Sequence, residues 1–171
     1  DLFPKNFNYE KYLIDNKLED LIGKKNPQNT VEKSKRNDPF FNVNPEIKEP
    51  FSPEFDDLIR LHFLVKNRKA TTVLEYGVGY STIVMGDAIY QNSLDNSYPE
   101  IRCSNLFELH SIDTSEEFIK ITSKKVPNKL KPIINLHFSD AIMTEFNGRI
   151  CALFKNNPNI SPDIIYVDGP D

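Results

Sequence analysis

The feature that most constrains the fold is a short glycine-rich turn with the sequence EYGVGYST at residues 75–82. Residues 71–74 before it are β-branched and apolar, which favours a buried strand, and apolar residues recur at helical spacing from Ile83 to Ile89. Gly77 and Gly79 permit backbone angles and a close ligand approach that a Cβ would block. The pattern therefore predicts a strand, a tight turn and a helix whose first N–H groups face a nucleotide-like ligand.

The residue types within this turn discriminate between ligands. Dinucleotide-binding turns read G-x-G-x-x-G/A, whereas the third small position is Thr82 in this chain. We place Glu75 at the tip of the strand, where a carboxylate is poorly matched to a pyrophosphate and well matched to a cationic ligand. An NAD(P)-dependent oxidoreductase therefore stays only as an alternative.

Three further predicted strands end in acidic residues. Residues 106–112 lead to Asp113, residues 133–138 precede Asp140, and residues 163–167 lead to Asp168. Ligands of open α/β sheets bind at the carboxyl ends of the strands, so we expect these carboxylates to converge on one crevice. Taken singly, Asp113 and Asp140 are also consistent with plain helix caps.

The string acidic-x-Gly-x-Gly-x-Ser-Thr resembles the first motif of class I S-adenosylmethionine-dependent methyltransferases, in the subgroup where Ser-Thr replaces the third glycine. The cofactor carries a sulfonium and an ammonium, which suits an acidic residue in this motif. The resemblance covers roughly residues 52–171. It implies that the cofactor is bound by Glu75, Gly77, Gly79, Ser81 and Thr82.

The same resemblance assigns roles to the later acidic residues. It implies that Asp113 accepts hydrogen bonds from the ribose hydroxyls, and that Asp140 with Ala141 meets the adenine. It places Asp168 near the methionine moiety, the acceptor or a metal, and we take Asp168 as the catalytic candidate. Asp168 and Asp171 are hard oxygen ligands three residues apart, so they are weak candidates for a Mg²⁺ or Ca²⁺ site.

The predicted fold class is α/β, a Rossmann-like, doubly wound, mainly parallel sheet with helices on both faces. We expect the strand order three-two-one-four, counted along the chain. Such a methyltransferase sheet needs seven strands and the sequence supplies four, so we expect a fold truncated after the fourth strand and a polypeptide that continues beyond Asp171. Residues 51–171 are assigned to this cofactor-binding domain.

The first fifty residues are predicted to be an N-terminal extension. Apolar residues from Tyr9 to Ile22 predict one short amphipathic helix that ends at Gly23, and its mixed-charge polar face favours packing on the domain over a membrane anchor. Residues 24–50 read as a linker or substrate-side loop. Phe40 and Phe41 within it are expected either to line the acceptor site or to pack on the core.

A second helix is predicted to begin with Ser52 as N-cap and Pro53 at its first position, and to place His62 at the edge of the core. Residues 91–105 read as a long loop. His110 and His137 lie within predicted strands, where side chains point to the faces of the sheet rather than to its ligand-binding end.

Composition limits the partners. The net charge of −4, from 21 basic and 25 acidic residues, disfavours a nucleic-acid substrate. Cys103 and Cys151 are too few for a zinc site or disulfide framework, which together with the lack of a signal or membrane segment favours a cytoplasmic protein. We expect a methyltransferase acting at oxygen or nitrogen of a small-molecule or glycan-type acceptor; the alternative from another class is a non-catalytic α/β binding or assembly module. Homo-oligomer formation is left open.

Overall fold

The computed structural model describes residues 3–23, 55–95 and 105–168 of the 171-residue chain. Helices and strands alternate from α3 to β3, as expected for an α/β protein. The helices are α1 (Tyr9–Asp15), α2 (Glu19–Ile22), α3 (Phe55–Asn67), α4 (Tyr80–Ser93), α5 (Glu116–Lys125) and the 3₁₀ helix η3 (Asn128–Leu130). The strands are β1 (Thr72–Tyr76), β2 (Glu108–Asp113), β3 (Ile134–Phe138), β4 (Ala141–Phe146), β5 (Arg149–Phe154) and β6 (Ile164–Val167).

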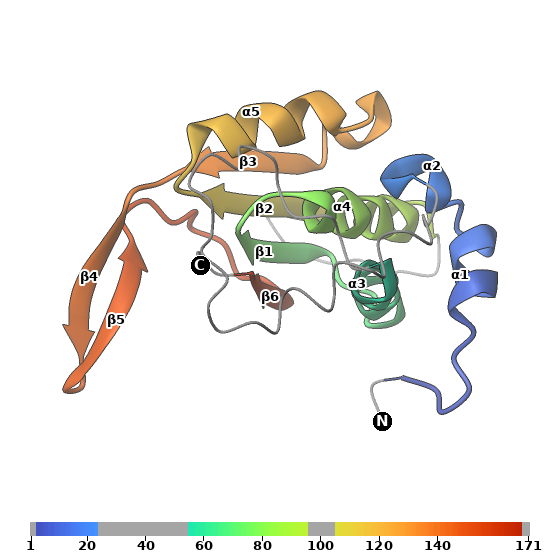
Figure 1. The fold of residues 1–171 in the computed structure, drawn as a ribbon, viewed down its shortest axis with the longest axis horizontal. Helices are drawn as coiled ribbons and strands as arrows, with labels where there is room; N and C mark the ends of the chain where they lie inside the picture. The colour runs from blue at the N-terminus through green and yellow to red at the C-terminus, as the bar shows by residue number, and fades with distance from the viewer. Residues whose placement is uncertain (1–2, 24–54, 96–104, 169–171) are drawn as a thin grey trace, which may run out of the picture.

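The central sheet contains four strands in the order β3-β2-β1-β6, all parallel (Figure 1). β1 lies in the middle, with Leu74 paired to His110 on one side and to Ile165 on the other. The three-two-one-four order predicted from the sequence is therefore confirmed. In a parallel sheet all carboxyl ends lie along one edge, and the glycine turn follows β1 at that edge.

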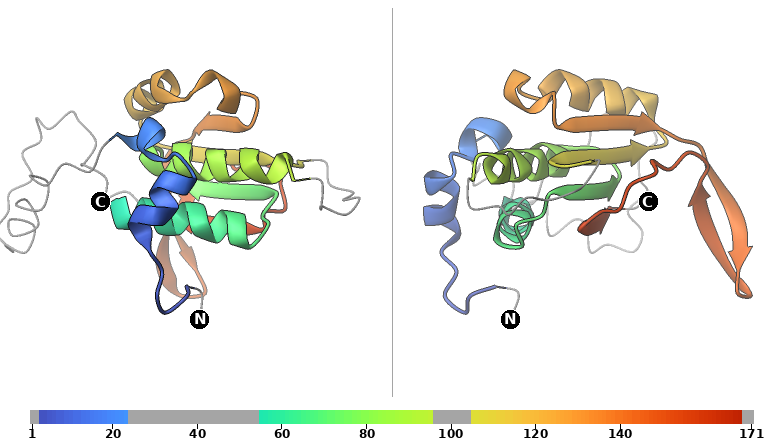
Figure 2. Two further views of the ribbon diagram at one scale, coloured as in Figure 1. Left: turned by 90° about the vertical axis from the view of Figure 1, so that its right-hand side faces the viewer. Right: turned by 180° about the vertical axis from the view of Figure 1, so that it is seen from behind.

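The described helices gather on one face of the sheet. Seen from behind, the sheet lies in front of α3 and α4 (Figure 2, right). Val73, Leu109 and Ile134 from three strands share a buried cluster with residues of α4. At Gly86, helix α4 passes very close to strand β3, because a Cβ built there would lie 2.6 Å from the Ile134 side chain. Both crossovers, through α4 and α5, run the same way across the sheet, and right-handed connections then place both helices on this face.

The β4–β5 hairpin was not predicted. It is an antiparallel pair joined by Asn147 and Gly148, and it projects from the sheet as an arm (Figure 1). Both turn residues have positive φ, 50° and 76°, as a two-residue type I′ turn requires. The arm carries exposed apolar side chains, among them Phe146 and Ile150.

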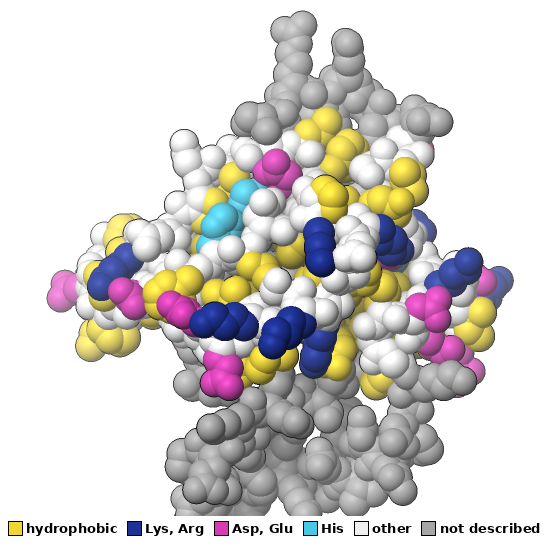
Figure 3. Space-filling model, turned by 90° about the horizontal axis from the view of Figure 1, so that it is seen from above, with side chains coloured by type: hydrophobic (Ala, Val, Ile, Leu, Met, Phe, Trp, Pro, Cys, Tyr) yellow, Lys and Arg dark blue, Asp and Glu magenta, His cyan; other side chains and the backbone are white. Residues whose placement is uncertain are grey.

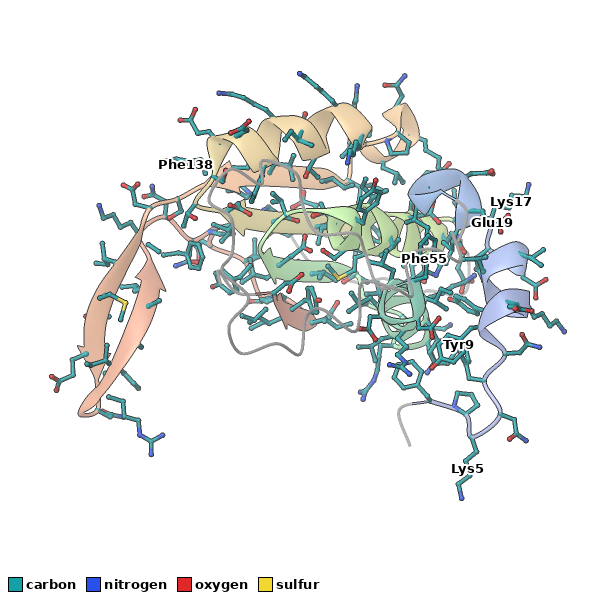
Figure 4. The ribbon with its side chains drawn as sticks, in the orientation of Figure 1. Lys5, Tyr9, Lys17, Glu19, Phe55 and Phe138 are labelled. Carbon is teal, nitrogen blue, oxygen red and sulfur yellow. The ribbon has the colours of Figure 1, made fainter. Side chains whose placement is uncertain are left out.

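The N-terminal helix predicted for residues 9–22 is broken into α1 and α2. The Leu18 N–H donates to Leu13 O and Lys17 adopts a φ of 54°, which closes α1 in a left-handed turn. The break turns Leu18 into the core and leaves Ile14 exposed. Gly23 ends α2 with a φ of 79°, as predicted. Figure 4 shows Tyr9 on α1 and Phe55 on the neighbouring helix α3.

Two other expectations need adjustment. Helix α4 continues to Ser93, so residues 91–93 belong to a helix rather than to the predicted loop. The strands begin one or two residues later than predicted, and β1 extends to Tyr76, so Glu75 lies within the strand rather than at its tip. The predicted cap residues Ser52 and Pro53, the linker with Phe40 and Phe41, and Cys103 lie outside the described residues.

Candidate functional site

The glycine turn is fixed between the ends of two neighbouring strands. The Gly77 N–H donates to Ile112 O on β2 at 2.7 Å, and the Asp168 N–H donates to Tyr76 O on β1 at 2.9 Å. Gly77 has a φ of 106°, and a Cβ there would lie 2.6 Å from the Asp168 carbonyl oxygen. Only glycine therefore allows the turn to pass this close to the end of β6.

Gly79 has a different environment. A Cβ built at this position meets no atom within 4 Å, so the space beside Gly79 is open. The Gly79 N–H donates to Thr82 Oγ1 at 3.0 Å, which fixes the start of α4. The first N–H groups of a helix lack partners within the helix, and they attract groups that accept hydrogen bonds. The open space beside Gly79 is therefore a place where a ligand can approach the backbone.

Glu75 is fully buried under the turn. Its carboxylate accepts hydrogen bonds from three hydroxyl groups: Ser81 at 2.5 Å, Thr82 at 2.7 Å and Ser111 at 2.6 Å. The carboxylate thus joins β1, β2 and the first turn of α4. The sequence motif predicts that this side chain faces a cationic ligand, whereas in the structure it points inward and is buried in the protein.

Burial raises the pKa of Glu75 to about 7, and the nearby Asp168 adds to the rise. The three hydroxyl donors act in the opposite direction because they stabilise the charged form. The charge state of Glu75 therefore changes near neutral pH. The same carboxylate accepts the hydrogen bonds of Ser81 and Thr82 at the start of α4.

Asp113 connects the end of β2 to the glycine turn. Its Oδ2 accepts from the Val78 N–H at 3.0 Å and its Oδ1 from the Ser115 N–H at 2.7 Å. Partial burial raises the pKa of Asp113, and these N–H donors oppose the rise. The Thr114 N–H is a third backbone donor to this half-buried carboxylate, which has four lone pairs in all. The α5 cap is Ser115, whose hydroxyl accepts from Phe118, so the plain capping interpretation of Asp113 is replaced by this bridge.

The third acidic residue, Asp140, lies beside Asp113. The Ser139 N–H donates to the Asp113 carbonyl at 3.0 Å, which places the end of β3 next to the end of β2. The Asp140 side chain is exposed and pairs with Lys155 at 3.3 Å. Ala141 is the first residue of β4, paired with Phe154.

Asp168 directly follows β6 and closes the same edge of the sheet. Its charge, together with burial, raises the pKa of Tyr166 to about 12. Asp171, the other candidate metal ligand, lies outside the described residues, so the Mg²⁺ or Ca²⁺ site stays a prediction. Within the described ranges, no group of three or more His, Cys, Asp or Glu side chains is arranged to hold a metal ion.

Two contributors to this edge, Ser111 and Tyr76, were not predicted from the sequence. Ser111 lies opposite Glu75 in the β1–β2 register and supplies the third hydroxyl. In the sequence, Ser111 could have been noticed as a small polar residue between the apolar residues of a predicted strand. The Tyr76 ring packs on Phe154 with centroids 5.0 Å apart, and its hydroxyl donates to Asn157 at 3.0 Å. This contact holds the base of the hairpin against the end of β1.

A cavity of about 490 Å³ lies elsewhere, between the N-terminal helices and the second half of α4. It is bordered by Asp87, whose carboxylate accepts from Lys129 at 2.8 Å and Gln91 at 2.7 Å. Asp87 also lies 3.4 Å from His62, which accepts from or donates to Tyr12 at 2.9 Å. Since these groups satisfy one another, we treat the network as the link that holds α1 on α3 and α4.

Comparisons with known proteins were made for the whole chain. No family model matches it, and neither does any curated protein. Solved structures with a similar arrangement include the O-methyltransferase TomG from Streptomyces achromogenes, involved in tomaymycin synthesis, in complex with SAM. It has 17% identity and a TM-score of 0.45, and the match covers 95% of this chain and 63% of that one.

A second similar structure is the O-methyltransferase from Bacillus cereus in complex with SAH. It has 18% identity and a TM-score of 0.37, with 77% of this chain and 52% of that chain covered. The chain thus spans less than two thirds of the length of either protein. Among the described residues, no helix is long and apolar enough to cross a membrane.

Proposed function

We propose that this chain is the cofactor-binding part of an S-adenosylmethionine-dependent methyltransferase acting on oxygen or nitrogen of a small-molecule acceptor. The observation that carries the proposal is the arrangement at the carboxyl edge of the sheet. There the open space beside Gly79 follows Val78, whose N–H donates to the half-buried carboxylate of Asp113. A ribose has two adjacent hydroxyls, and a carboxylate matches such a diol with one oxygen for each.

The residues around this carboxylate have separate tasks in the proposed site. Gly77 lets the turn pass close to Asp168, and Gly79 leaves room for the cofactor. Ser81 and Thr82 keep the start of α4 in place through Glu75, which acts from beneath the turn. Asp140 is proposed to reach the adenine, which requires its exposed carboxylate to leave Lys155. The acidic edge suits a cofactor that carries positive charge.

When bound, the cofactor supplies an electrophilic methyl group on a sulfonium. The chain's contribution is then to hold the acceptor atom in line with that group, since methyl transfer depends chiefly on distance and orientation. Asp168 is the proposed residue at the acceptor side, because it ends β6 at the same edge as the turn. A carboxylate there is able to accept a proton from a hydroxyl or amine acceptor.

The charge of the chain supports a small-molecule acceptor over a nucleic acid. The net charge is −4, and the proposed site holds the carboxylates of Asp113, Asp140 and Asp168, with Lys155 paired to Asp140. Polyanionic substrates need basic surfaces that neutralise phosphates. The acceptor is therefore proposed to be neutral or cationic.

Calorimetric titration with S-adenosylhomocysteine and with NAD tests the proposal. Binding of S-adenosylhomocysteine is expected, and Asp113→Asn should weaken it by about tenfold to a hundredfold, since a hydrogen bond to a charged group contributes about 1.5–3 kcal/mol. Asp57→Asn, an exposed residue of α3 paired with Arg60, is the matched control and should bind normally. Binding of NAD alone would reject the proposal in favour of an oxidoreductase.

A further inference from the structure

A chain of three titratable side chains lies on the sheet face opposite α3 and α4. Glu108 and His110 come from β2, and His137 comes from the neighbouring edge strand β3. His110 Nε2 lies 2.9 Å from Glu108 Oε2, and His110 Nδ1 lies 3.0 Å from His137 Nε2. The two imidazole rings are nearly parallel, with planes 6° apart. None of these residues belongs to the glycine turn or to the network around Asp87.

The carboxylate fixes which nitrogen of His110 carries the proton. The same Glu108 oxygen accepts a hydrogen bond from the Asn105 side-chain amide at 2.9 Å. A carboxylate only accepts, so His110 donates through Nε2 and keeps a lone pair on Nδ1. That lone pair faces His137. A histidine that binds a metal through one ring nitrogen commonly donates the N–H of its other ring nitrogen to a carboxylate, as His110 does to Glu108.

The spacing of the two facing nitrogens fits a pair of metal ligands. Metal–imidazole bonds of about 2.0–2.1 Å at angles of about 90–109° place two nitrogens about 3.0–3.4 Å apart. His110 Nδ1 and His137 Nε2 already lie 3.0 Å apart. Because the two nitrogens face each other, each ring must rotate to point its lone pair at the ion, while the distance between the nitrogens is already suitable. The proton on His137 Nε2 moves to Nδ1 of the same ring through solvent, so no net proton is released.

The pair reaches solvent mainly through His137. His137 is half-buried, whereas His110 is only 8% exposed, and Figure 3 shows histidine atoms at the molecular surface. Since no third His, Cys, Asp or Glu joins the pair within the described residues, water fills the other coordination positions. Such a site exchanges its ion readily.

We propose that His110 and His137 form a binding site for a divalent transition-metal ion, with Glu108 as the residue that orients His110. Neutral imidazoles favour zinc, copper and nickel over magnesium or calcium. The site lies on a sheet face, apart from the carboxyl edge, and the inference is independent of the proposed function.

Zinc titration followed by NMR of the histidine ring nitrogens tests this proposal. The chain has three histidines, so the signals of His62 serve as an internal control. Zinc should shift His110 Nδ1 and His137 Nε2 at one equivalent and leave His62 unchanged. Zinc held by Cys151, a free cysteine on β5, would leave all three histidines unshifted and would overturn the proposal.

Two variants and a control sharpen the test. His137→Gln keeps a polar side chain on the exposed edge strand and should weaken zinc binding at least about tenfold. Glu108→Gln should weaken it by about tenfold to a hundredfold through loss of the orienting carboxylate. Glu116→Gln, which removes an exposed carboxylate of α5, should leave it unchanged. Unchanged zinc affinity in either of the first two variants contradicts the assignment, and binding of S-adenosylhomocysteine should be the same in all.

Discussion

At the scale of single residues, Glu75 has the strongest influence on the candidate site. Its carboxylate is fully buried and accepts hydrogen bonds from hydroxyl groups of α4 and β2. A buried carboxylate is costly unless it is hydrogen-bonded, and here three donors offset that cost. The residue thus acts beneath the proposed cofactor site as a positioning group.

Glu75 makes stability depend on pH with a definite sign. Its folded pKa of about 7 lies above the ordinary value of 4.5, so the folded state binds the proton more tightly than the unfolded chain. Its contribution is fully present below pH 4.5 and is lost as the pH rises through 7. Relative to Glu75→Gln, we expect the wild type to lose roughly 3 kcal/mol of unfolding free energy across this range, at about 1.4 kcal/mol per pH unit.

Urea unfolding at several pH values measures this difference. Glu117→Gln, an exposed residue of α5, is the control and should follow the wild-type profile. Parallel profiles for wild type and Glu75→Gln between pH 4.5 and 7 would show that Glu75 does not titrate there.

The two turn glycines should respond differently to alanine. Gly77→Ala forces a Cβ to 2.6 Å from a backbone oxygen at a φ of 106°, so we expect it to destabilise the protein by about 1–3 kcal/mol. Gly79→Ala meets no atom within 4 Å, so its stability should stay within about 0.5 kcal/mol while binding of S-adenosylhomocysteine weakens. Thermal unfolding and calorimetry separate the two effects. Equal stability losses would contradict the geometry.

At the scale of elements, the parallel strands were predictable because each contains β-branched or other apolar residues in a short run, as in Thr72–Tyr76 and Ile164–Val167. Their exact ends were not, since they depend on pairing with neighbouring strands, and this is why Glu75 was misplaced at the tip of β1. The hairpin was predictable in principle from Asn147-Gly148, the strongest short-range hairpin signal. The break between α1 and α2 was not, because it depends on burying Leu18 against the core.

The contact between α4 and β3 can be tested with a double-mutant cycle. Gly86→Ala brings a Cβ within 2.6 Å of the Ile134 side chain, so overpacking should cost about 1–3 kcal/mol despite the better helix propensity of alanine. Ile134→Ala alone should cost about 2–5 kcal/mol through the cavity it leaves. The double variant should lose less than the sum, because the new methyl group enters that cavity. Strict additivity in urea unfolding would mean that the two residues do not touch.

The packing of α1 on α3 can be tested by removing the Tyr12 hydroxyl. Tyr12→Phe removes the 2.9 Å hydrogen bond to His62, so we expect a loss of about 1 kcal/mol. Tyr9→Phe removes an exposed contact with Arg60 and should change stability by less than about 0.5 kcal/mol. Equal thermal shifts in the two variants would show that the buried bond contributes nothing specific.

At the scale of the whole molecule, one proposed site lies at the carboxyl edge of the parallel sheet and the other on the sheet face opposite α3 and α4. The order β3-β2-β1-β6 places Asp113, the glycine turn and Asp168 side by side at that edge. The candidate site could be predicted from the sequence as a set of strand ends. The inward direction of Glu75 and the exposed pairing of Asp140 with Lys155 required the folded chain.

The most direct test of the central claim is the map of backbone amide NMR shifts on addition of S-adenosylhomocysteine. The account predicts that the largest shifts fall on Val78 to Thr82, on Asp113 to Ser115 and on Asp168, where the turn and the strand ends meet. No shift at these positions, or shifts confined to the cavity beside Asp87 and Lys129, would contradict it.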